Sequence, residues 1–450
     1  MIRVQLYKLP QTGEIRLPAN FIKGRRINAN NIIVSFGQRQ VEASLESDPH
    51  PSPRFRVGLS SDLMSELGLR SGVRLRAFWD ARKQQFRLGP VVAIMVWRYR
   101  RVSSAWLFGA ATDMARTFVR LARSRGVVAY AFSPRDIDWN SKGVIGFVPA
   151  GRGWRRVSLP LPDVVYDRIQ SRALDATRRM QNVKRQLMAL EGLHYFNPCF
   201  LDKWDTYQAL VKDPIVQRYL PRTEKLTSLD QLGPWLRTYP TVYIKPSRGS
   251  LGLGIVKISR MARGFRYQRI RMGGGSQAGL CSSLPKLERR LRNILPKRTM
   301  IIQQGLRLAR YKGRPYDIRV MVQKTTRGNW VCTNMIARVA SAGSAVSNVA
   351  EGGTMISVRR AIRGSLRINV GSAVRRIRRG ARLIARAVEE QYGQEFGEFG
   401  IDMALDRRGR VWLIEVNAKP GRQTDEPGTP PSMRRVTRYA IAKAGFSERG

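Results

Sequence analysis

The chain has 450 residues, of which 43% are hydrophobic, and this content is typical of a folded globular protein and excludes a disordered polycation. Its 81 Lys and Arg residues outnumber 32 Asp and Glu residues, for a formal net charge of +49. The length predicts two to four domains. The charge favours acidic partners, although it is spread along the whole chain and a solvated basic surface is the simplest interpretation.

Cysteine and histidine contribute little to the expected chemistry. Cys199, Cys281 and Cys332 are too few and too scattered for a disulfide framework, which indicates a reducing compartment. His50 and His194 are the only histidines, so histidine catalysis is not expected. The N-terminus lacks the apolar stretch of a signal peptide, and no run of about 18 apolar residues predicts a membrane span. We therefore expect a cytoplasmic protein, or one that reaches a surface without the usual secretion signal.

Residues 1–88 predict a small β-rich domain. Short runs of alternating apolar and polar residues recur at a spacing typical of a small barrel or sandwich. One helix interrupts them, with Ser60 or Ser61 as its N-cap.

Residues 89–194 predict an α/β domain. The apolar run PVVAIMVW is typical of a strand buried on both faces, and a helical pattern from Trp106 to Leu121 follows it. The strand VVAYAF comes next, which completes the start of a βαβ unit.

Residues 195–450 predict a third domain of mixed composition. A helix from Lys203 precedes the strands TVYIKP and GIVKIS, which flank a glycine-rich loop, and residues 260–280 form a basic variable stretch. The Arg-rich helix Gly371–Tyr392 carries an apolar stripe of Val374, Ile377, Ala381, Ile384 and Val388, so its arginines are expected to face solvent. A nucleic-acid or polymer track is the less favoured interpretation.

The stretch FGIDMALDRRGRVWLIEVNAKPGR predicts a hairpin with a turn at residues 406–409, which places Asp402 opposite Leu413. In this register Asp402, Glu415 and Asn417 share one face. Their three oxygen-bearing side chains suit Mg²⁺, and the alternative is a solvent-facing surface with incidental acids. The other face is predicted to be the core face, made of Ile401, Met403, Leu405, Trp412, Ile414 and Val416.

The stretch KPSRGSLGLGIVKI predicts a phosphate-binding loop between two strands. Lys245 ends the first strand, and backbone N–H groups of the loop could close over phosphate oxygens. The loop is not a Walker A motif, since no GK[ST] ends it, and by itself it could be a plain turn. The loop residues considered are Ser247, Gly249, Ser250, Gly252 and Gly254.

From about residue 195 to 425 these motifs, in this order, resemble the ATP-grasp superfamily. Within it the chain is most similar to the YheC/YheD-type endospore coat-associated family, through FNPCFLDKWDTYQALV, YIKPSRGSLGLGI, QQGLRLARYKGRPYDIRVMVQK, SNVAEGGT and the hairpin sequence. The resemblance implies a mixed α+β and α/β fold. It consists of a two-lobed ATP-grasp domain (195–450), an α/β pre-ATP-grasp domain (89–194) and the small β-rich domain (1–88).

The resemblance also implies residue roles. Lys203 and Lys245 would reach the α- and β-phosphates of ATP, and the 247–254 loop would form a mobile lid over them. Arg319 and Arg338 would steady the transferring phosphoryl group or acyl phosphate. The other implied sites are a lobe-closing contact at Asn348, one or two Mg²⁺ ions at Asp402, Glu415 and Asn417, and an inter-lobe hinge meeting adenine at Gln303, Gln304, Gly305 and Leu306.

The implied activity is that of an ATP-dependent carboxylate–amine ligase with an acyl-phosphate intermediate. ATP and Mg²⁺ would be its cofactors, and an acidic peptide or polymer is one candidate substrate, in a spore-associated setting. The alternative is a non-catalytic spore-associated or polyanion-binding protein that retains the ATP-grasp scaffold. Intact Lys245, Arg319, Asp402, Glu415 and Asn417 favour the enzyme. Nucleic acid is the less favoured partner, and the sequence does not specify the oligomeric state.

Overall fold

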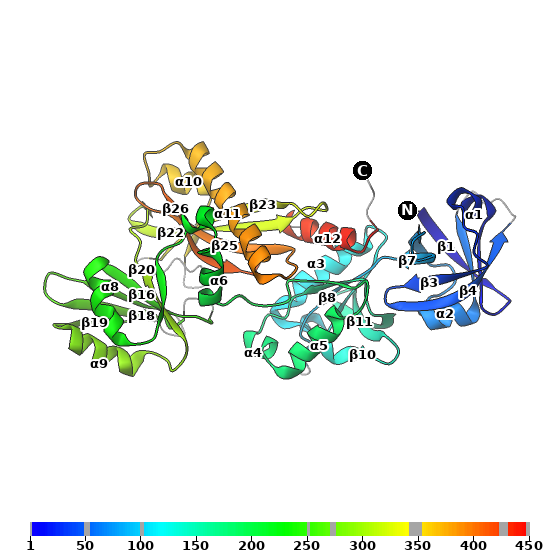
Figure 1. The fold of residues 1–450 in the computed structure, drawn as a ribbon, viewed down its shortest axis with the longest axis horizontal. Helices are drawn as coiled ribbons and strands as arrows, with labels where there is room; N and C mark the ends of the chain where they lie inside the picture. The colour runs from blue at the N-terminus through cyan, green and yellow to red at the C-terminus, as the bar shows by residue number, and fades with distance from the viewer. Residues whose placement is uncertain are drawn as a thin grey trace.

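The computed structural model describes residues 2–48, 55–99, 103–249, 253–270, 276–341, 353–422 and 431–446. Four β-sheets follow one another along an elongated molecule, from the N-terminal strands at one end to a pair of helix-backed sheets at the other (Figure 1).

The N-terminal strands close into a barrel. The elements are β1 (Ile2–Leu9), β2 (Glu14–Pro18), α1 (Ala19–Arg25), β3 (Asn31–Phe36), β4 (Arg39–Asp48), β5 (Arg56–Ser60), α2 (Ser61–Leu67), β6 (Arg74–Asp80) and β7 (Gln85–Gly89). Their order around the barrel is β1-β5-β2-β4-β3-β7-β6, so the barrel, one of the two expected architectures, is the one formed. Ser60 is the N-cap of α2, as expected, whereas α1 was not predicted.

The second sheet has a parallel centre. Its elements are β8 (Val91–Met95), α3 (Thr112–Arg123), β9 (Val128–Phe132), β10 (Ile137–Asp138), β11 (Gly143–Ala150), β12 (Gly153–Pro160), β13 (Val164–Asp167), α4 (Arg172–Asp175), α5 (Arg178–Met188) and β14 (His194–Phe196). Strands β9, β8, β13 and β14 pair in parallel in that order, which confirms the βαβ prediction. The predicted start of the helix at Trp106 is wrong, because Gly109 has a φ of +54° that interrupts the helix before Thr112.

The third sheet is antiparallel and carries helices on one face. Its elements and neighbours are α6 (Lys203–Leu210), α7 (Pro214–Gln217), β15 (Thr223–Leu226), α8 (Leu232–Thr238), β16 (Thr241–Pro246), β17 (Val256–Arg260), β18 (Phe265–Ile270), β19 (Ser276–Cys281), α9 (Leu284–Ile294) and β20 (Met300–Gln304). The strand order is β15-β20-β16-β17-β18-β19. Val242 and Ile244 pack against α8 and α9, so Lys245 and Tyr243 lie on the uncovered face.

The basic stretch 260–280, for which no secondary structure was predicted, contains two strands. Most of it forms β18 and β19, which extend the sheet at its edge. In β18, Tyr267 joins the core under the helices, and Arg266 and Gln268 alternate with it on the uncovered face. The prediction missed this period-two pattern because basic residues dominate it.

The fourth sheet faces the third. Its elements are β21 (Arg310–Tyr311), β22 (Arg314–Lys324), β23 (Trp330–Val339), β24 (Thr354–Ile356), α10 (Val358–Arg363), α11 (Val370–Tyr392), β25 (Glu398–Leu405) and β26 (Val411–Asn417), in the strand order β24-β23-β22-β25-β26. The apolar stripe of α11 is buried against this sheet, as predicted, and Arg375, Arg378 and Arg382 are exposed.

The hairpin of β25 and β26 contains a bulge that the sequence did not predict. Asp402 pairs with Glu415 instead of Leu413, and Met403 pairs with Leu413, so Ile414 is the extra residue. The register also differs at the turn, where Leu405 pairs with Val411 and not with the residue directly after the predicted turn. The predicted core face is therefore wrong at Trp412 and Ile414, whose places are taken by Val411 and Leu413. Asp402, Glu415 and Asn417 nevertheless share a face, because the bulge restores the alternation beyond it.

The C-terminal helix α12 (Pro431–Lys443) packs against elements that lie far from it in the sequence. Val436 and Tyr439 share a buried cluster with Phe118 of α3 and Phe196 of β14. Figure 1 shows α12 between α3 and the fourth sheet. This helix therefore links the second and fourth sheets, and the division of the chain into domains at 88 and 194 stays a prediction.

Candidate functional site

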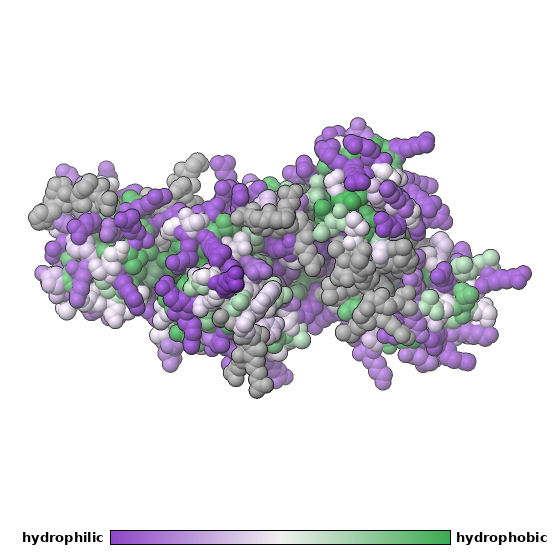
Figure 2. All heavy atoms as spheres, turned by 180° about the vertical axis from the view of Figure 1, so that it is seen from behind, coloured by the Kyte–Doolittle hydropathy of each residue, from purple (hydrophilic) through white to green (hydrophobic). Residues whose placement is uncertain are grey.

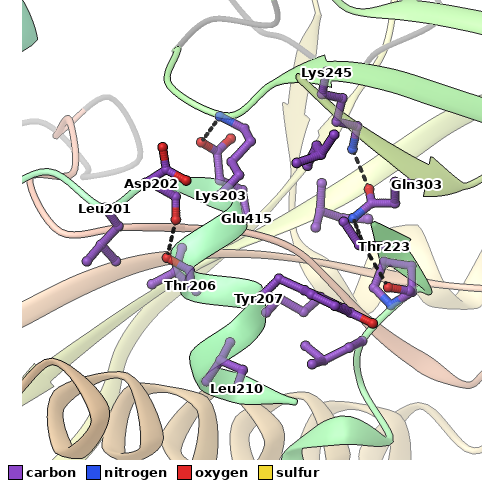
Figure 3. Close-up of a pocket in the computed structure, with 16 residues that line it drawn as sticks. Leu201, Asp202, Lys203, Thr206, Tyr207, Leu210, Thr223, Lys245, Gln303 and Glu415 are labelled. Atoms are coloured by element: carbon purple, nitrogen blue, oxygen red, sulfur yellow. Dashed lines mark hydrogen bonds and ion pairs between the residues drawn. The ribbon is translucent and has the colours of Figure 1, made fainter. Parts of the chain in front are cut away.

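A cleft opens where α6, β16, β20 and β26 meet (Figure 3). Its empty space is about 510 Å³, including the part open to solvent. Lys203 lines it from α6, Lys245 and Gln303 from the third sheet, and Glu415 from the fourth. The structure thus brings together residues that the sequence analysis singled out across more than 200 positions.

The N-terminus of α6 anchors the glycine-rich loop. Asp202 caps the helix by accepting hydrogen bonds from the backbone N–H groups of Trp204 and Asp205, and the Ser247 hydroxyl also donates to it. Lys203 Nζ donates to the Gly249 carbonyl at 3.0 Å and forms an ion pair with Glu415 Oε1, also at 3.0 Å. Lys203 therefore connects the loop to the carboxylate on β26.

Lys245 lies on the uncovered face of β16 with a neutral partner. Its Nζ donates to Gln303 Oε1 at 2.6 Å, and Gln303 Nε2 donates to the Thr223 hydroxyl at 2.9 Å (Figure 3). Burial first, and then the nearby charge of Lys203, lower the pKa of Lys245 to about 8, and Glu415 opposes the shift. Among the described residues no carboxylate lies at contact distance from its ammonium group, so a neutral partner holds this lysine in place.

Two arginines converge on Asp402. Arg319 forms a two-pronged ion pair with it, and Arg338 Nη2 lies 3.0 Å from Asp402 Oδ1. Arg338 is also held by both carboxylate oxygens of Asp317, at 2.6 and 2.7 Å. Burial alone would raise the pKa of Asp402, but the charges of Arg319 and Arg338 prevail and lower it.

Strand register explains this convergence. Asp402 on β25 has two direct cross-strand neighbours, Arg319 on β22 and Glu415 on β26. Cross-strand neighbours point to the same face, so the charged groups form a row on the face opposite α11. Gly400 leaves room for this row, because a Cβ there would lie 3.4 Å from Arg319 Nη1 and 2.7 Å from Pro420.

The oxygen donors at the edge of this row fit a divalent cation. Glu415 and Asn417 follow one another on one face of β26, beside Asp402, and carboxylate and amide oxygens are ligands that Mg²⁺ accepts together with phosphates. Within the part of the chain that the structure describes, no three acidic, histidine or cysteine side chains gather closely enough to hold a metal by themselves. The donor set therefore suits a metal shared with a phosphate ligand.

The remaining predicted residues occupy different places. Gln304 ends β20, and Gly305 donates its N–H to the Thr241 carbonyl at 2.8 Å. Leu306 belongs to the crossing segment that then reaches the fourth sheet, where Ala309 N–H bonds the Leu405 carbonyl. Gly254 lies just before β17 with a φ of +76°. Ser250, Gly252 and Asn348 lie outside the described residues.

Sequence reasoning missed three residues that organise the site. Asp202 holds the loop, Thr223 holds Gln303, and Asp317 holds Arg338. The sequence contained a signal for two of them, because Asp202 stands at the N-cap position before Lys203 and Asp317 stands two residues before Arg319 on the same strand face. Thr223 had none, since its role depends on the pairing of β15 with β20.

Residues 192–445 match the family described as YheC/D like ATP-grasp, and this match covers more than half of the chain. The chain belongs to this family. Its two facing sheets, joined by the segment after β20, are the lobes of an ATP-grasp fold.

Relatives of this YheC/D-like ATP-grasp chain include two from Bacillus subtilis (strain 168). It is 28% identical over 367 residues to the endospore coat-associated protein YheD, and the aligned region covers 81% of this chain and 80% of YheD. It is 20% identical over 314 residues to the endospore coat-associated protein YheC, with 69% of this chain and 86% of the relative covered.

Among solved structures, the chain is similar to D-alanyl-alanine synthetase A from Vibrio cholerae O1 biovar eltor str. N16961, with a TM-score of 0.47 and 11% identity over 79% of this chain and 98% of that one. It is also similar to the ATP-grasp ligase PsnB, with a TM-score of 0.43 and 13% identity over 79% and 99% of the two chains. None of the helices in the described ranges is both long and apolar enough to cross a membrane.

Proposed function

We propose that the protein is an ATP-dependent carboxylate–amine ligase. The observation that carries this proposal is the convergence of Lys203, Lys245 and Glu415 around one inter-lobe cleft, beside the Arg319–Asp402 pair. This set of groups matches the needs of phosphoryl transfer. The two lysines can bind phosphates, the carboxylate can bind a divalent cation, and the arginines can stabilise a developing negative charge.

In the proposed reaction, the substrate carboxylate attacks the γ-phosphate of ATP, which gives an acyl phosphate and ADP. An amine then attacks the acyl carbon and displaces phosphate, so that an amide forms and the amine loses a proton. Lys203 and Lys245 would orient the phosphates, and Arg319 and Arg338 would neutralise the charge of the transferring group. Asp317 and Asp402 would fix the two guanidinium groups, so positioning and electrostatics supply the catalysis.

Mg²⁺ would be held by Asp402, Glu415 and Asn417, and when bound it would neutralise phosphate oxygens as a Lewis acid. Asp402 already accepts hydrogen bonds from two arginines, so it would share its oxygens between them and the metal. Glu415, whose Oε1 contacts Lys203, would hold the ion on the side of the cleft where Lys203 orients the phosphates.

ATP binding tests the site. Titration calorimetry with Mg-ATP should show saturable binding, and Lys245→Ala and Glu415→Gln should each weaken it by about tenfold or more, since each removes a charged contact worth about 1.5–3 kcal/mol. Lys286→Ala and Glu390→Gln are matched controls, because both side chains are exposed and outside the cleft. Absence of ATP binding by the wild-type protein would refute the site and the ligase together.

The second candidate function is a non-catalytic spore-associated or polyanion-binding protein on an ATP-grasp scaffold. The +49 charge and the names of the two Bacillus relatives favour it. ADP release measured across pools of carboxylates and amines separates the two candidates. Release that depends on both substrates supports the ligase, whereas ATP binding without release under any pair supports the scaffold. Under either function we propose spore association, which immunodetection in spore-coat extracts tests.

A further inference from the structure

A second groove lies between strands β17 and β18 of the third sheet and the β21–β22 hairpin of the fourth. Its empty space is about 880 Å³, including the part open to solvent. Four cations line it: Lys257 and Arg266 on one wall, and Arg310 and Arg314 on the other. No carboxylate is among the described lining residues, so the groove is electropositive on both sides.

The first wall continues from the ATP cleft. Lys257 pairs with Tyr243 across β16 and β17, and Tyr243 shares its face with Lys245 two residues later. Diagonal neighbours of this kind lie about 7–8 Å apart. The next step outward is Arg266, which pairs with Ser259 across β17 and β18 on the same face. The basic side chains thus run from Lys245 to β18, the strand next to the edge of the sheet.

The second wall leads to the arginine cluster. Pro315 lines the groove, and Asp317 and Arg319 follow on the same face of β22 at successive alternate positions. Four residues of strand cover about 13 Å. A ligand in extended conformation could therefore lie in the groove and still present one end to Arg319 and Asp402.

The cations of the groove repel one another. Burial lowers the pKa of Lys257, and the charges of Arg310 and Arg266 lower it further. Arg310 donates from Nη1 to the Gly313 carbonyl at 2.8 Å, which orients its guanidinium without neutralising it. An anionic ligand would relieve this repulsion, and arginine binds carboxylates through paired hydrogen bonds.

We propose that this groove binds the acidic segment of a peptide substrate whose reacting carboxyl group lies at the Arg319–Asp402 cluster. The proposal rests on the ligase function above and names its substrate class. A peptide is favoured over nucleic acid for two reasons. The described lining has no aromatic side chain on which a base could stack, and the reaction centre requires a carboxylate.

The test uses the full-length protein with Mg-ADP and a short oligoglutamate peptide as the probe. The double variant Arg266→Gln/Arg314→Gln should bind the peptide about tenfold or more weakly, since two charge-assisted contacts are lost. The control is Arg378→Gln/Arg382→Gln, which removes the same charge from the exposed surface of α11 and should leave peptide affinity within about twofold. Thermal unfolding of both variants checks that they fold.

The outcomes separate this proposal from the proposed function. Equal loss of peptide binding in both double variants would overturn the groove as the peptide-binding site and indicate a general effect of net charge. A parallel loss of ATP affinity in the groove variant would assign the groove to the nucleotide, and stronger competition by an oligonucleotide of equal charge would assign it to nucleic acid. A wild-type protein that binds ATP but not oligoglutamate overturns this proposal alone, whereas one that binds no ATP overturns the ligase.

Discussion

The charge state of Lys245 depends on its neutral hydrogen-bond partner. Its ammonium group is buried beside Lys203 and bonded to the uncharged Gln303, and this environment lowers its pKa to about 8. A carboxylate at position 303 would have held the lysine protonated. The charge on Lys245 in the free protein therefore changes within the range of ordinary assay conditions.

ATP affinity is expected to fall as the pH rises above 8. Phosphate favours the protonated lysine, so binding above the pKa of the free protein requires uptake of one proton, and the affinity should fall by up to about tenfold per pH unit. Calorimetry from pH 7 to pH 10 in buffers of different ionisation enthalpy measures both the affinity and the proton uptake. Lys245→Arg is the control, because arginine stays charged and should flatten the profile. A wild-type affinity that does not change with pH would contradict this account.

The segment after β20 is the element that joins the two lobes. Gly305 lies against the backbone of Thr241, and a Cβ added at position 305 would come within 2.5 Å of the Thr241 carbonyl oxygen. That oxygen also accepts the Gly305 N–H, so neither backbone can move without losing the hydrogen bond. Glycine at this position therefore allows the chain to leave one sheet and reach the other.

Gly305→Ala is expected to destabilise the protein by about 1–3 kcal/mol, as overpacking against a fixed backbone does, and to weaken ATP binding by displacing Gln303. Urea unfolding and ATP titration measure the two effects. Gly24→Ala in α1 is the comparison, because a Cβ there meets nothing within 4 Å, and its effect should stay within about 1 kcal/mol. Equal stability of the two variants would show that the Gly305 contact relaxes freely.

At the scale of the whole molecule, a buried charge network ties the second sheet to the fourth. Glu398 at the start of β25 is fully buried and bonds Arg168, the Tyr166 hydroxyl and Arg422. Asn197 bonds the Glu398 and Ala418 carbonyls beside it. Glu398 lies four residues before Asp402 on β25, so the network ties the strand that carries Asp402 to the preceding sheet.

Glu398→Gln is expected to cost about 3–5 kcal/mol, because it leaves the buried Arg168 and the mostly buried Arg422 without this counter-charge. Burial would raise the pKa of Glu398, but Arg422 and Arg168 outweigh it and lower the value. The wild-type stabilisation is therefore complete above the ordinary glutamate pKa and is lost as the pH falls through the folded one. Urea unfolding against pH should show this loss in the wild type and its absence in the variant.

Glu390→Gln provides the matched comparison for Glu398→Gln. Glu390 pairs with Arg386 on the exposed side of α11, where both side chains are more than half accessible to water. Such exposed pairs contribute about 0–1 kcal/mol, so this variant should unfold nearly as the wild type does. A similar loss of unfolding free energy in both variants would show that the buried Glu398 network stabilises the protein no more than an exposed ion pair does.

Much of this architecture was predictable because its signals are local. The continuous apolar run of β8, the stripe of α11 and the strands around the glycine-rich loop follow from residues a few positions apart. The hairpin register was not predictable in the same way. The turn is one residue longer than predicted, so that Leu405 pairs with Val411, and this shift brings Val411 and Leu413 into the core. The bulge at Ile414 then restores the alternation for the residues beyond it.

The sequence by itself determined which residues can supply the chemistry: two lysines, two arginines and three oxygen-bearing side chains on one face of a hairpin. Strand periodicity suffices for the hairpin face, because it depends on neighbours in the chain, whereas the lysines and arginines followed from the resemblance of their motifs to the ATP-grasp superfamily. Only the tertiary structure decided that Gln303 holds Lys245, that Asp402 lies between two arginines and that a basic groove continues from the cleft. These features depend on pairing between distant strands, and pairing is a property of the folded chain as a whole.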